Sequence, residues 1–188
     1  INEIAFEAEK YIHGKPSGID NTIATYGGIQ YYKKRDYSSI DITDPSPHLL
    51  IVNSLILRST KQYVEKVAEL TRSNPIKYNS ILQKIGALAE DAKSDLIDGN
   101  LIELGRLMEK NHQLLEDLGV GNPILNDIRN FLKKRGSLGS KLTGAGGGGC
   151  VIALFDDLNK AKKTSSAIEK LGYQVFISNL SEKGVKRE

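Results

Sequence analysis

Two carboxylates flank a segment that is rich in glycine and proline. Glu9 lies in a stretch with helical spacing of apolar residues, and Asp20 follows His13-Gly14-Lys15-Pro16-Ser17-Gly18, which cannot continue a helix. Transfer of a phosphoryl group to an alcohol needs a carboxylate at the acceptor hydroxyl and cations on the phosphates. Because Mg²⁺ takes only one or two protein carboxylates, the pair suits this chemistry, with Glu9 on the metal and Asp20 at the hydroxyl.

Each residue of this segment also has an ordinary structural interpretation. An Asp before Asn commonly caps a helix, and a Glu on a helix commonly faces solvent. We therefore expect Ser17 or Asp20 to cap a short helix over residues 21–24. His13 suits a ligand, a hydrogen-bond donor to a substrate, or a partly buried residue with its own partner. The carboxylate pair alone leaves these alternatives open.

A second chemical candidate is the loop Gly144-Ala145-Gly146-Gly147-Gly148-Gly149, which holds five glycines in six positions. It satisfies the dinucleotide pattern G-x-G-x-x-G, but that site needs a helix to begin in the loop. The apolar residues 150–155 that follow predict a strand instead, and the Gly-Lys-Ser/Thr ending of a P-loop is missing. We predict a loop between two strands whose bare amides face an anion or pack closely on another segment. A plain hairpin turn is the alternative.

Composition narrows the class of protein. The chain has 188 residues and a net charge of +3, and its only basic runs, 33–35 and 133–135, lie beside turn-forming residues. We therefore expect no nucleic-acid partner. Its single cysteine, Cys150, excludes an internal disulfide and favours a reducing cytoplasm. No apolar run is long enough for a membrane span, so we expect no membrane partner.

The order of predicted elements indicates an α+β fold. Helices, then two strands, a helix and a last strand do not match a doubly wound parallel sheet. The Pro-rich connection 35–48 predicts a domain boundary, with one part at residues 1–45 and another at 46–188. The predicted helices are 1–12, 21–24, 60–70, 78–96, 101–118, 123–134 and 158–171, and the predicted strands are 29–32, 49–52, 140–143, 150–155 and 173–178.

Four separated motifs resemble one family. His13-Gly14-Lys15-Pro16-Ser17-Gly18-Ile19-Asp20-Asn21 is similar to the catalytic-aspartate segment of the mevalonate kinases, a group within the GHMP kinase family. Residues 141–150, KLTGAGGGGC, resemble the third signature motif of that family. Leu57-Arg58-Ser59-Thr60-Lys61 resembles the strand-to-helix turn near the substrate, and residues 118–121 match the helical region before the glycine loop.

The resemblance implies a role for each matching residue. It implies ATP-dependent phosphorylation of the mevalonate 5-hydroxyl, a step in isoprenoid and sterol precursor synthesis, with Mg²⁺ as cofactor. Asp20 would be the catalytic carboxylate and Glu9 the Mg²⁺ ligand. The residues placed near substrate or phosphate are His13, Ser17, Arg58, Thr60, Ala145, Gly144, Gly146, Gly147 and Gly148.

The resemblance also implies a domain organisation. Residues 1–45 would end an N-terminal domain of the ribosomal-protein-S5-like kind, and residues 46–188 would form a helix-rich, ferredoxin-like C-terminal domain. The family's glycine/serine phosphate loop and a nearby lysine have no counterpart here, so we expect a longer parent chain and no catalysis by this portion alone. Phosphomevalonate kinase, galactokinase, homoserine kinase and a non-catalytic binding module with the same fold are the alternatives, and a homodimer is left open.

Overall fold

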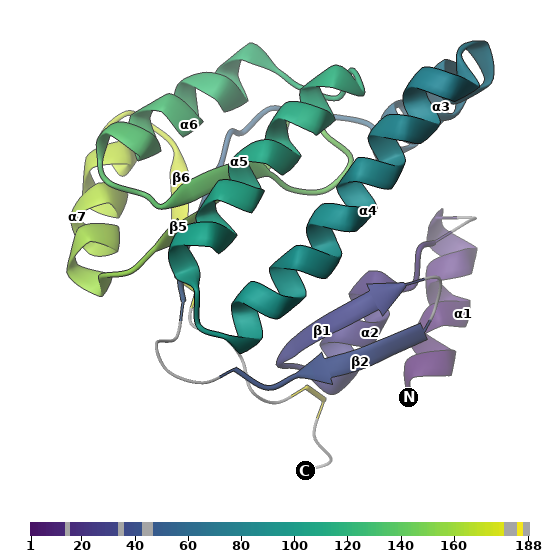
Figure 1. The fold of residues 1–188 in the computed structure, drawn as a ribbon, viewed down its shortest axis with the longest axis horizontal. Helices are drawn as coiled ribbons and strands as arrows, with labels where there is room; N and C mark the ends of the chain where they lie inside the picture. The colour runs from purple at the N-terminus through teal and green to yellow at the C-terminus, as the bar shows by residue number, and fades with distance from the viewer. Residues whose placement is uncertain (14–15, 34–35, 43–46, 179–183, 186–188) are drawn as a thin grey trace. The chain divides into compact units, whose positions relative to one another are not determined.

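The computed structural model describes residues 1–13, 16–33, 36–42, 47–178 and 184–185. Its contacts divide the chain into two units, Ile1–Asp44 with Leu180–Glu188, and Pro45–Asn179. Figure 1 labels the elements of both units. None of the helices in the described ranges has the length and hydrophobicity needed to cross a lipid bilayer.

The first unit combines two helices with a β-hairpin. The chain segment near the C-terminus returns to it, because the Val185 amide donates a hydrogen bond to the Ala24 carbonyl at 3.1 Å. In the hairpin, Ile29 lies opposite Ile40 in antiparallel register. The elements are α1 (Asn2–His13), α2 (Ile19–Tyr26), β1 (Ile29–Lys33) and β2 (Asp36–Ile40).

The second unit is built on a four-stranded antiparallel sheet in the order β4-β5-β3-β6. Strands β3 and β5 lie in the middle, and a helical connection precedes β4 while α7 precedes β6. This is the strand order of a split βαβ, ferredoxin-like sheet, and it confirms the predicted α+β class. The strands are β3 (His48–Asn53), β4 (Gly139–Leu142), β5 (Cys150–Phe155) and β6 (Gln174–Ser178).

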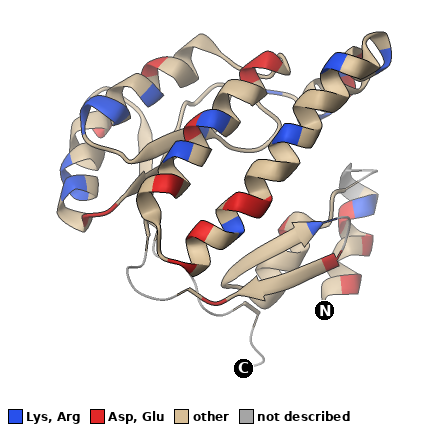
Figure 2. Cartoon of the chain, in the orientation of Figure 1, with Lys and Arg blue, Asp and Glu red and all other residues tan. Residues whose placement is uncertain are grey.

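The helices of this unit pack on the two faces of the sheet. Val151, Ala153 and Phe155 of β5 join the core formed with α6 and α7, whereas Leu154 joins a second cluster with Leu101 and other residues of α5. Alternate side chains of one strand therefore serve opposite faces. Charged residues of both signs are distributed along the helices (Figure 2). The helices are α3 (Thr60–Ser73), α4 (Pro75–Ile97), α5 (Leu101–Asp117), α6 (Pro123–Lys134) and α7 (Leu158–Glu169).

Side chains from α5 and α6 form hydrogen bonds with the backbone groups on the outer edge of strand β4. The Ser140 amide donates to Glu109 Oε1 at 2.7 Å, and the Leu142 amide donates to His112 Nδ1 at 3.1 Å. Arg129 donates from Nε to the Ser140 carbonyl at 3.0 Å and from Nη2 to Glu109 Oε2 at 2.7 Å. An edge strand otherwise leaves such backbone groups unpaired. This network fixes α5 along the strand that leads into the glycine loop.

His112 is fully buried in this network. Because its Nδ1 accepts from Leu142, the proton lies on Nε2, which donates to Asn126 Oδ1 at 2.8 Å. Burial, assisted by the charge of Arg129, lowers the pKa of His112, although the hydrogen bond to Asn126 opposes this. The folded protein therefore holds a neutral imidazole at this position.

Most predicted elements are present, with three differences. The predicted connection 35–48 contains β2, whose polar residues Asp36-Tyr37-Ser38-Ser39 gave no strand signal, although pairing with β1 supplies the backbone hydrogen bonds. Helix α4 begins at Pro75 rather than at residue 78, because the Asn74 side chain caps it by accepting from the Lys77 amide at 3.1 Å. The short helix predicted at 21–24 is α2 and extends over Ile19–Tyr26.

The buried imidazole should make stability depend on pH. Below 6.5, the ordinary pKa of histidine, the unfolded chain binds a proton that the folded protein resists, so the free energy of unfolding should fall as the pH falls. The slope cannot exceed about 1.4 kcal/mol per pH unit for one group. Urea unfolding between about pH 7.5 and about pH 5.5 measures it.

His112→Gln should flatten this slope and destabilise the fold by roughly 1–3 kcal/mol through unpaired polar groups. His48→Gln in β3, measured in the same way, is the matched control for the loss of a histidine. A His112→Gln protein with an unchanged slope would contradict the assignment.

Candidate active site

The predicted site residues fall into two groups, one in each unit. Glu9, His13, Ser17 and Asp20 belong to the first unit. The second group lies in the β3–α3 connection and the loop between β4 and β5, and it contains Arg58, Thr60, Gly144, Ala145, Gly146, Gly147 and Gly148.

Backbone contacts hold the turn before Asp20. Gly18 has φ +87°, and a Cβ at this position would lie 2.5 Å from Tyr32 Oη and 3.4 Å from the Phe6 ring. The Tyr32 hydroxyl donates to the Ser17 carbonyl at 2.7 Å, and Thr22 Oγ1 donates to the Gly18 carbonyl at 2.6 Å. Only glycine fits this close, left-handed position. The turn is therefore fixed by the residues around it.

Asp20 lies in the first turn of α2 and is exposed. The expectation that Ser17 or Asp20 caps this helix is wrong, because Gly18 occupies the N-cap position without a side-chain hydrogen bond. The Ser17 hydroxyl instead accepts a long hydrogen bond of 3.4 Å from the Ile19 amide. Within the described residues, the Asp20 carboxylate has no hydrogen-bond partner. It is thus free of a capping role.

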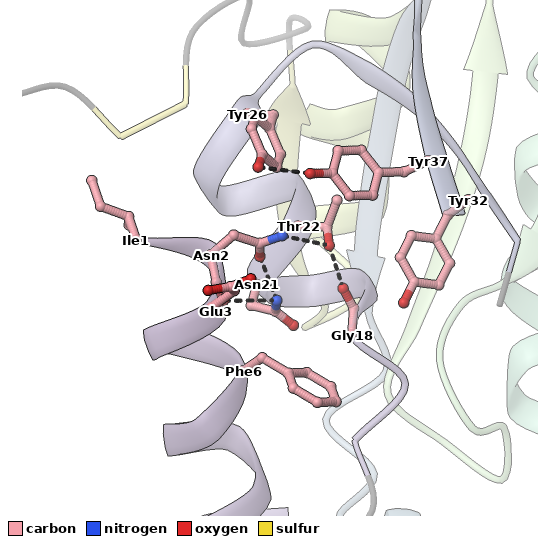
Figure 3. A pocket seen from close by; sticks show the side chains of 10 residues that line it. All are labelled: Ile1, Asn2, Glu3, Phe6, Gly18, Asn21, Thr22, Tyr26, Tyr32 and Tyr37. Carbon is pink, nitrogen blue, oxygen red and sulfur yellow. Dashed lines mark hydrogen bonds between the residues drawn. The ribbon is translucent and has the colours of Figure 1, made fainter. Parts of the chain in front are cut away.

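The residue after Asp20 anchors α2 to α1. Asn21 is only 7% exposed, and its Nδ2 donates to the side-chain oxygen of Asn2. Figure 3 shows this contact in a polar pocket of about 370 Å³, beside the hydrogen bond between the Tyr26 and Tyr37 hydroxyls. Asn21 therefore fixes the helix that carries Asp20, which leaves the Asp20 side chain at the surface.

Two predicted residues of the first unit lie on α1. Glu9 is half-buried and already has an interacting partner. His13 ends α1, and its side chain lies outside the described residues. In the part of the chain that the structure describes, no three His, Cys, Asp or Glu side chains cluster as metal ligands. A metal here would rest on Glu9 with substrate oxygens and water, the donor set that Mg²⁺ accepts.

The glycine loop connects β4 to β5, as predicted, and β5 begins at Cys150 without an intervening helix. This observation excludes the dinucleotide-binding interpretation. Gly144, Gly146, Gly147 and Gly149 all have φ between +73° and +86°, a region that favours glycine. The loop conformation therefore depends on its composition.

Other segments of the second unit enclose this loop. The Gly147 amide donates to the Val120 carbonyl at 2.8 Å, and Asn122 Nδ2 donates to the Gly147 carbonyl at 3.0 Å. A Cβ on Gly147 would overlap the Tyr63 ring, and one on Gly148 would lie 2.9 Å from Ile56. The β3–α3 connection, α3 and the α5–α6 connection thus contact the loop too closely for larger residues.

The guanidinium of Arg58 lies against both ends of the glycine loop. Its Nη1 donates to the Gly146 carbonyl at 2.9 Å, and Cβ atoms at Gly144 and Gly149 would lie 2.6 and 2.9 Å from the guanidinium. One hydrogen bond leaves other N–H donors of a guanidinium for a ligand. The arrangement brings a cation next to the backbone of the loop, and a cation of this kind suits an anionic group.

The remaining predicted residues lie beside this arrangement. Thr60 is the first residue of α3 and is exposed, while the neighbouring Ser59 caps the helix by accepting from the Gln62 amide at 3.4 Å. Ala145 is half-buried in the loop. Sequence reasoning missed Tyr63 and Asn122, whose types and spacing give no signal, because their role arises from contact with a distant segment.

Comparison with known proteins finds similarity to one family. Residues 87–174 match the family model "GHMP kinases C terminal". Over 98% of its length, the chain is 37% identical to the mevalonate kinase ERG12 of Gibberella zeae. The chain is therefore similar to GHMP kinases, and to mevalonate kinases among them. It is also 31% identical, over its whole length, to a mevalonate kinase of Thermococcus sibiricus.

Solved structures of GHMP kinases share the fold. The structure of L. major mevalonate kinase in complex with R-mevalonate superposes with a TM-score of 0.86 at 28% identity and covers 96% of this chain and 58% of that one. Lactococcus lactis galactokinase has a TM-score of 0.71 at 17% identity, which shows the fold alone. The chain covers 40% of the G. zeae relative and 57% of the T. sibiricus relative, about half their length.

The enclosed loop predicts a large effect of one methyl group. Gly147→Ala combines left-handed strain of about 1–2 kcal/mol with overpacking of about 1–3 kcal/mol against Tyr63. Gly136→Ala is the matched control, since Gly136 has φ +86° but open space around it, and should cost the strain alone. Urea unfolding measures both variants.

A second substitution separates crowding from strain. Tyr63→Ala should recover part of the stability lost in Gly147→Ala, because it removes the ring that the new Cβ meets. Equal destabilisation by Gly147→Ala and Gly136→Ala would argue against close packing of this loop.

Proposed function

We propose that this chain forms part of a mevalonate kinase, which transfers the γ-phosphoryl group of ATP to the 5-hydroxyl of mevalonate. The observation that carries the proposal is the similarity over the whole chain to mevalonate kinases, at 37% and 31% identity, joined to a structural match with a mevalonate complex. The loop and Arg58 supply a fitting anion site. The activity belongs to the longer protein, and we expect this portion alone to be inactive.

The proposed substrate matches the chemistry of the predicted residues. Mevalonate carries a carboxylate and a primary hydroxyl. Arg58 can hold a carboxylate with the guanidinium donors that Gly146 does not use. Asp20, which is exposed and caps no helix, receives the proton of the hydroxyl or orients its oxygen. Ser17 and Thr60 offer hydroxyl groups to substrate or phosphate.

We assign phosphate contacts to the glycine loop. Its positive-φ glycines hold the backbone in a tight loop, and Arg58 binds the loop at the Gly146 carbonyl. When bound, Mg²⁺ would neutralise charge on the transferring phosphoryl group, and Glu9 is the residue of this chain that would hold it. His13 is assigned to the substrate by the motif alone.

The alternative GHMP kinases receive weaker support. Galactokinase and phosphomevalonate kinase structures match at 17% and 18% identity, with TM-scores of 0.71 and 0.60. A substrate panel of mevalonate, phosphomevalonate, galactose and homoserine, assayed with ATP and the full-length protein, separates them. A non-catalytic binding module would bind mevalonate without turnover of ATP.

Several expectations stay predictions. They are an S5-like N-terminal domain ended by the first unit, a domain boundary at residues 45 and 46, a cytoplasmic location and a homodimer.

The catalytic assignment predicts a specific loss. Asp20→Asn in the full-length protein keeps the shape and removes the negative charge and basicity, so turnover should fall by about a hundredfold or more. Its melting temperature should stay near that of the wild type, because Asp20 caps no helix. Asp36→Asn, at an exposed carboxylate of the same unit, is the control and should keep full turnover. An Asp20→Asn enzyme with normal turnover would refute the role.

Glu9→Gln should behave differently. If Glu9 holds Mg²⁺, its loss raises the metal concentration required for half-maximal activity, and excess metal restores part of the turnover. Glu7→Gln on the same helix is the control, because Glu7 is exposed and pairs with Lys10 at the surface. Steady-state rates across a Mg²⁺ titration distinguish the two. An unchanged metal requirement in Glu9→Gln would exclude Glu9 as a ligand.

A further inference from the structure

A second cleft of about 370 Å³ lies within the second unit, between α4 and α5. Apolar stripes at helical spacing line it, with Ile85, Leu88 and Ala92 on one helix and Leu104 and Met108 on the other. The volume is in the range of small-molecule sites, which are mostly apolar with a few polar groups. The cleft is distinct from the polar pocket of the first unit.

One cation lines this apolar cleft. Lys141 of β4 lies opposite Ile152 of β5, so its side chain shares the face of the sheet that packs on α5. Among the described residues, no carboxylate forms an ion pair with Lys141 and no hydrogen bond holds its ammonium. Asn111 lines the same cleft, and its amide likewise has no partner in the described ranges.

An unpaired ammonium in apolar surroundings opposes folding. Burial lowers the pKa of Lys141, and no charge in the described part of the chain offsets this effect. Such a group costs free energy that an apolar side chain of similar length would not. A cation kept at this cost marks a candidate ligand site.

We propose that the cleft between α4 and α5 binds an aliphatic carboxylate, with its carboxylate on Lys141 Nζ and Asn111 and its chain along Ile85, Leu88 and Leu104. One carboxylate balances one ammonium, whereas a doubly charged phosphate would leave an uncompensated negative charge against apolar walls. The amide of Asn111 supplies a second donor for the second oxygen.

This ligand differs from the proposed substrate. The walls of the cleft offer few partners for the two hydroxyl groups of mevalonate, and burying unpaired hydroxyls is costly. An unbranched chain loses no hydrogen bonds there and gains from burial of its methylene groups.

The cleft reaches the glycine loop at Gly144, which also lines it. A Cβ on Gly144 would lie 2.6 Å from Arg58 Nη2, so a ligand in the cleft contacts the residue on which the Arg58 guanidinium lies. Occupancy would therefore act next to the anion site without filling it.

The test uses octanoate as the probe and isothermal titration calorimetry on the full-length protein. Octanoate should bind saturably, and octanol, with the same chain and no charge, should bind about tenfold or more weakly. Lys141→Met should weaken octanoate binding by a similar factor and raise the melting temperature of the ligand-free protein. Lys110→Met, at an exposed lysine of α5, should change neither.

A second variant tests the cleft independently, in case Lys141→Met fails to fold. Ala92→Phe fills the cleft from α4 and should abolish binding while circular dichroism keeps the wild-type spectrum. The proposal is overturned by absent octanoate binding in the wild type, or by wild-type affinity in a folded Lys141→Met or Ala92→Phe protein. Displacement of octanoate by mevalonate would assign the cleft to the substrate and overturn it too, while leaving the proposed kinase activity intact.

Discussion

The second unit depends on the space available to the backbone of the loop between β4 and β5. Tyr63, Val120 and Ile56 approach this loop so closely that a Cβ at Gly146, Gly147 or Gly148 would collide with them. Four of its glycines also have positive φ. Close packing and left-handed geometry act on the same residues, so the loop is ordered by its neighbours although its composition favours disorder. This is how a glycine-rich segment can hold amides in fixed directions.

The strand that leads into the loop is fixed by a polar network. Glu109 and His112 of α5 accept the outward amides of Ser140 and Leu142, and Arg129 of α6 closes the network. Helices α5 and α6 are thereby bound to strand β4. The connection between these two helices also contacts the loop that follows β4, through Val120 and Asn122. Two sets of contacts therefore fix the position of the loop: those at strand β4, from which it begins, and those with the α5–α6 connection. Lys141, between Ser140 and Leu142, faces the apolar cleft instead of joining this network.

In the first unit, a different set of contacts fixes the turn before Asp20. Gly18 provides the left-handed turn, Tyr32 holds the preceding carbonyl, and Asn21 fixes α2 from its buried side. These contacts leave Asp20 exposed in the first turn, so its carboxylate is oriented by the helix and not by partners of its own. A side chain without structural partners is available for chemistry, which is the physical basis of its proposed role.

Local sequence determined most of the elements and the chemistry of the candidate residues. Helical periodicity gave the helices of the second unit, apolar residues after the glycines gave β5, and motif residues gave Asp20, Arg58 and the loop. Tertiary structure decided the rest: the polar strand β2, which exists through pairing with β1, the N-cap at Gly18, and the roles of Tyr63, Asn122 and Lys141. The reason is physical. Periodicity and glycine content are properties of neighbouring residues, whereas burial, strand pairing and the absence of a partner depend on segments far apart in the chain.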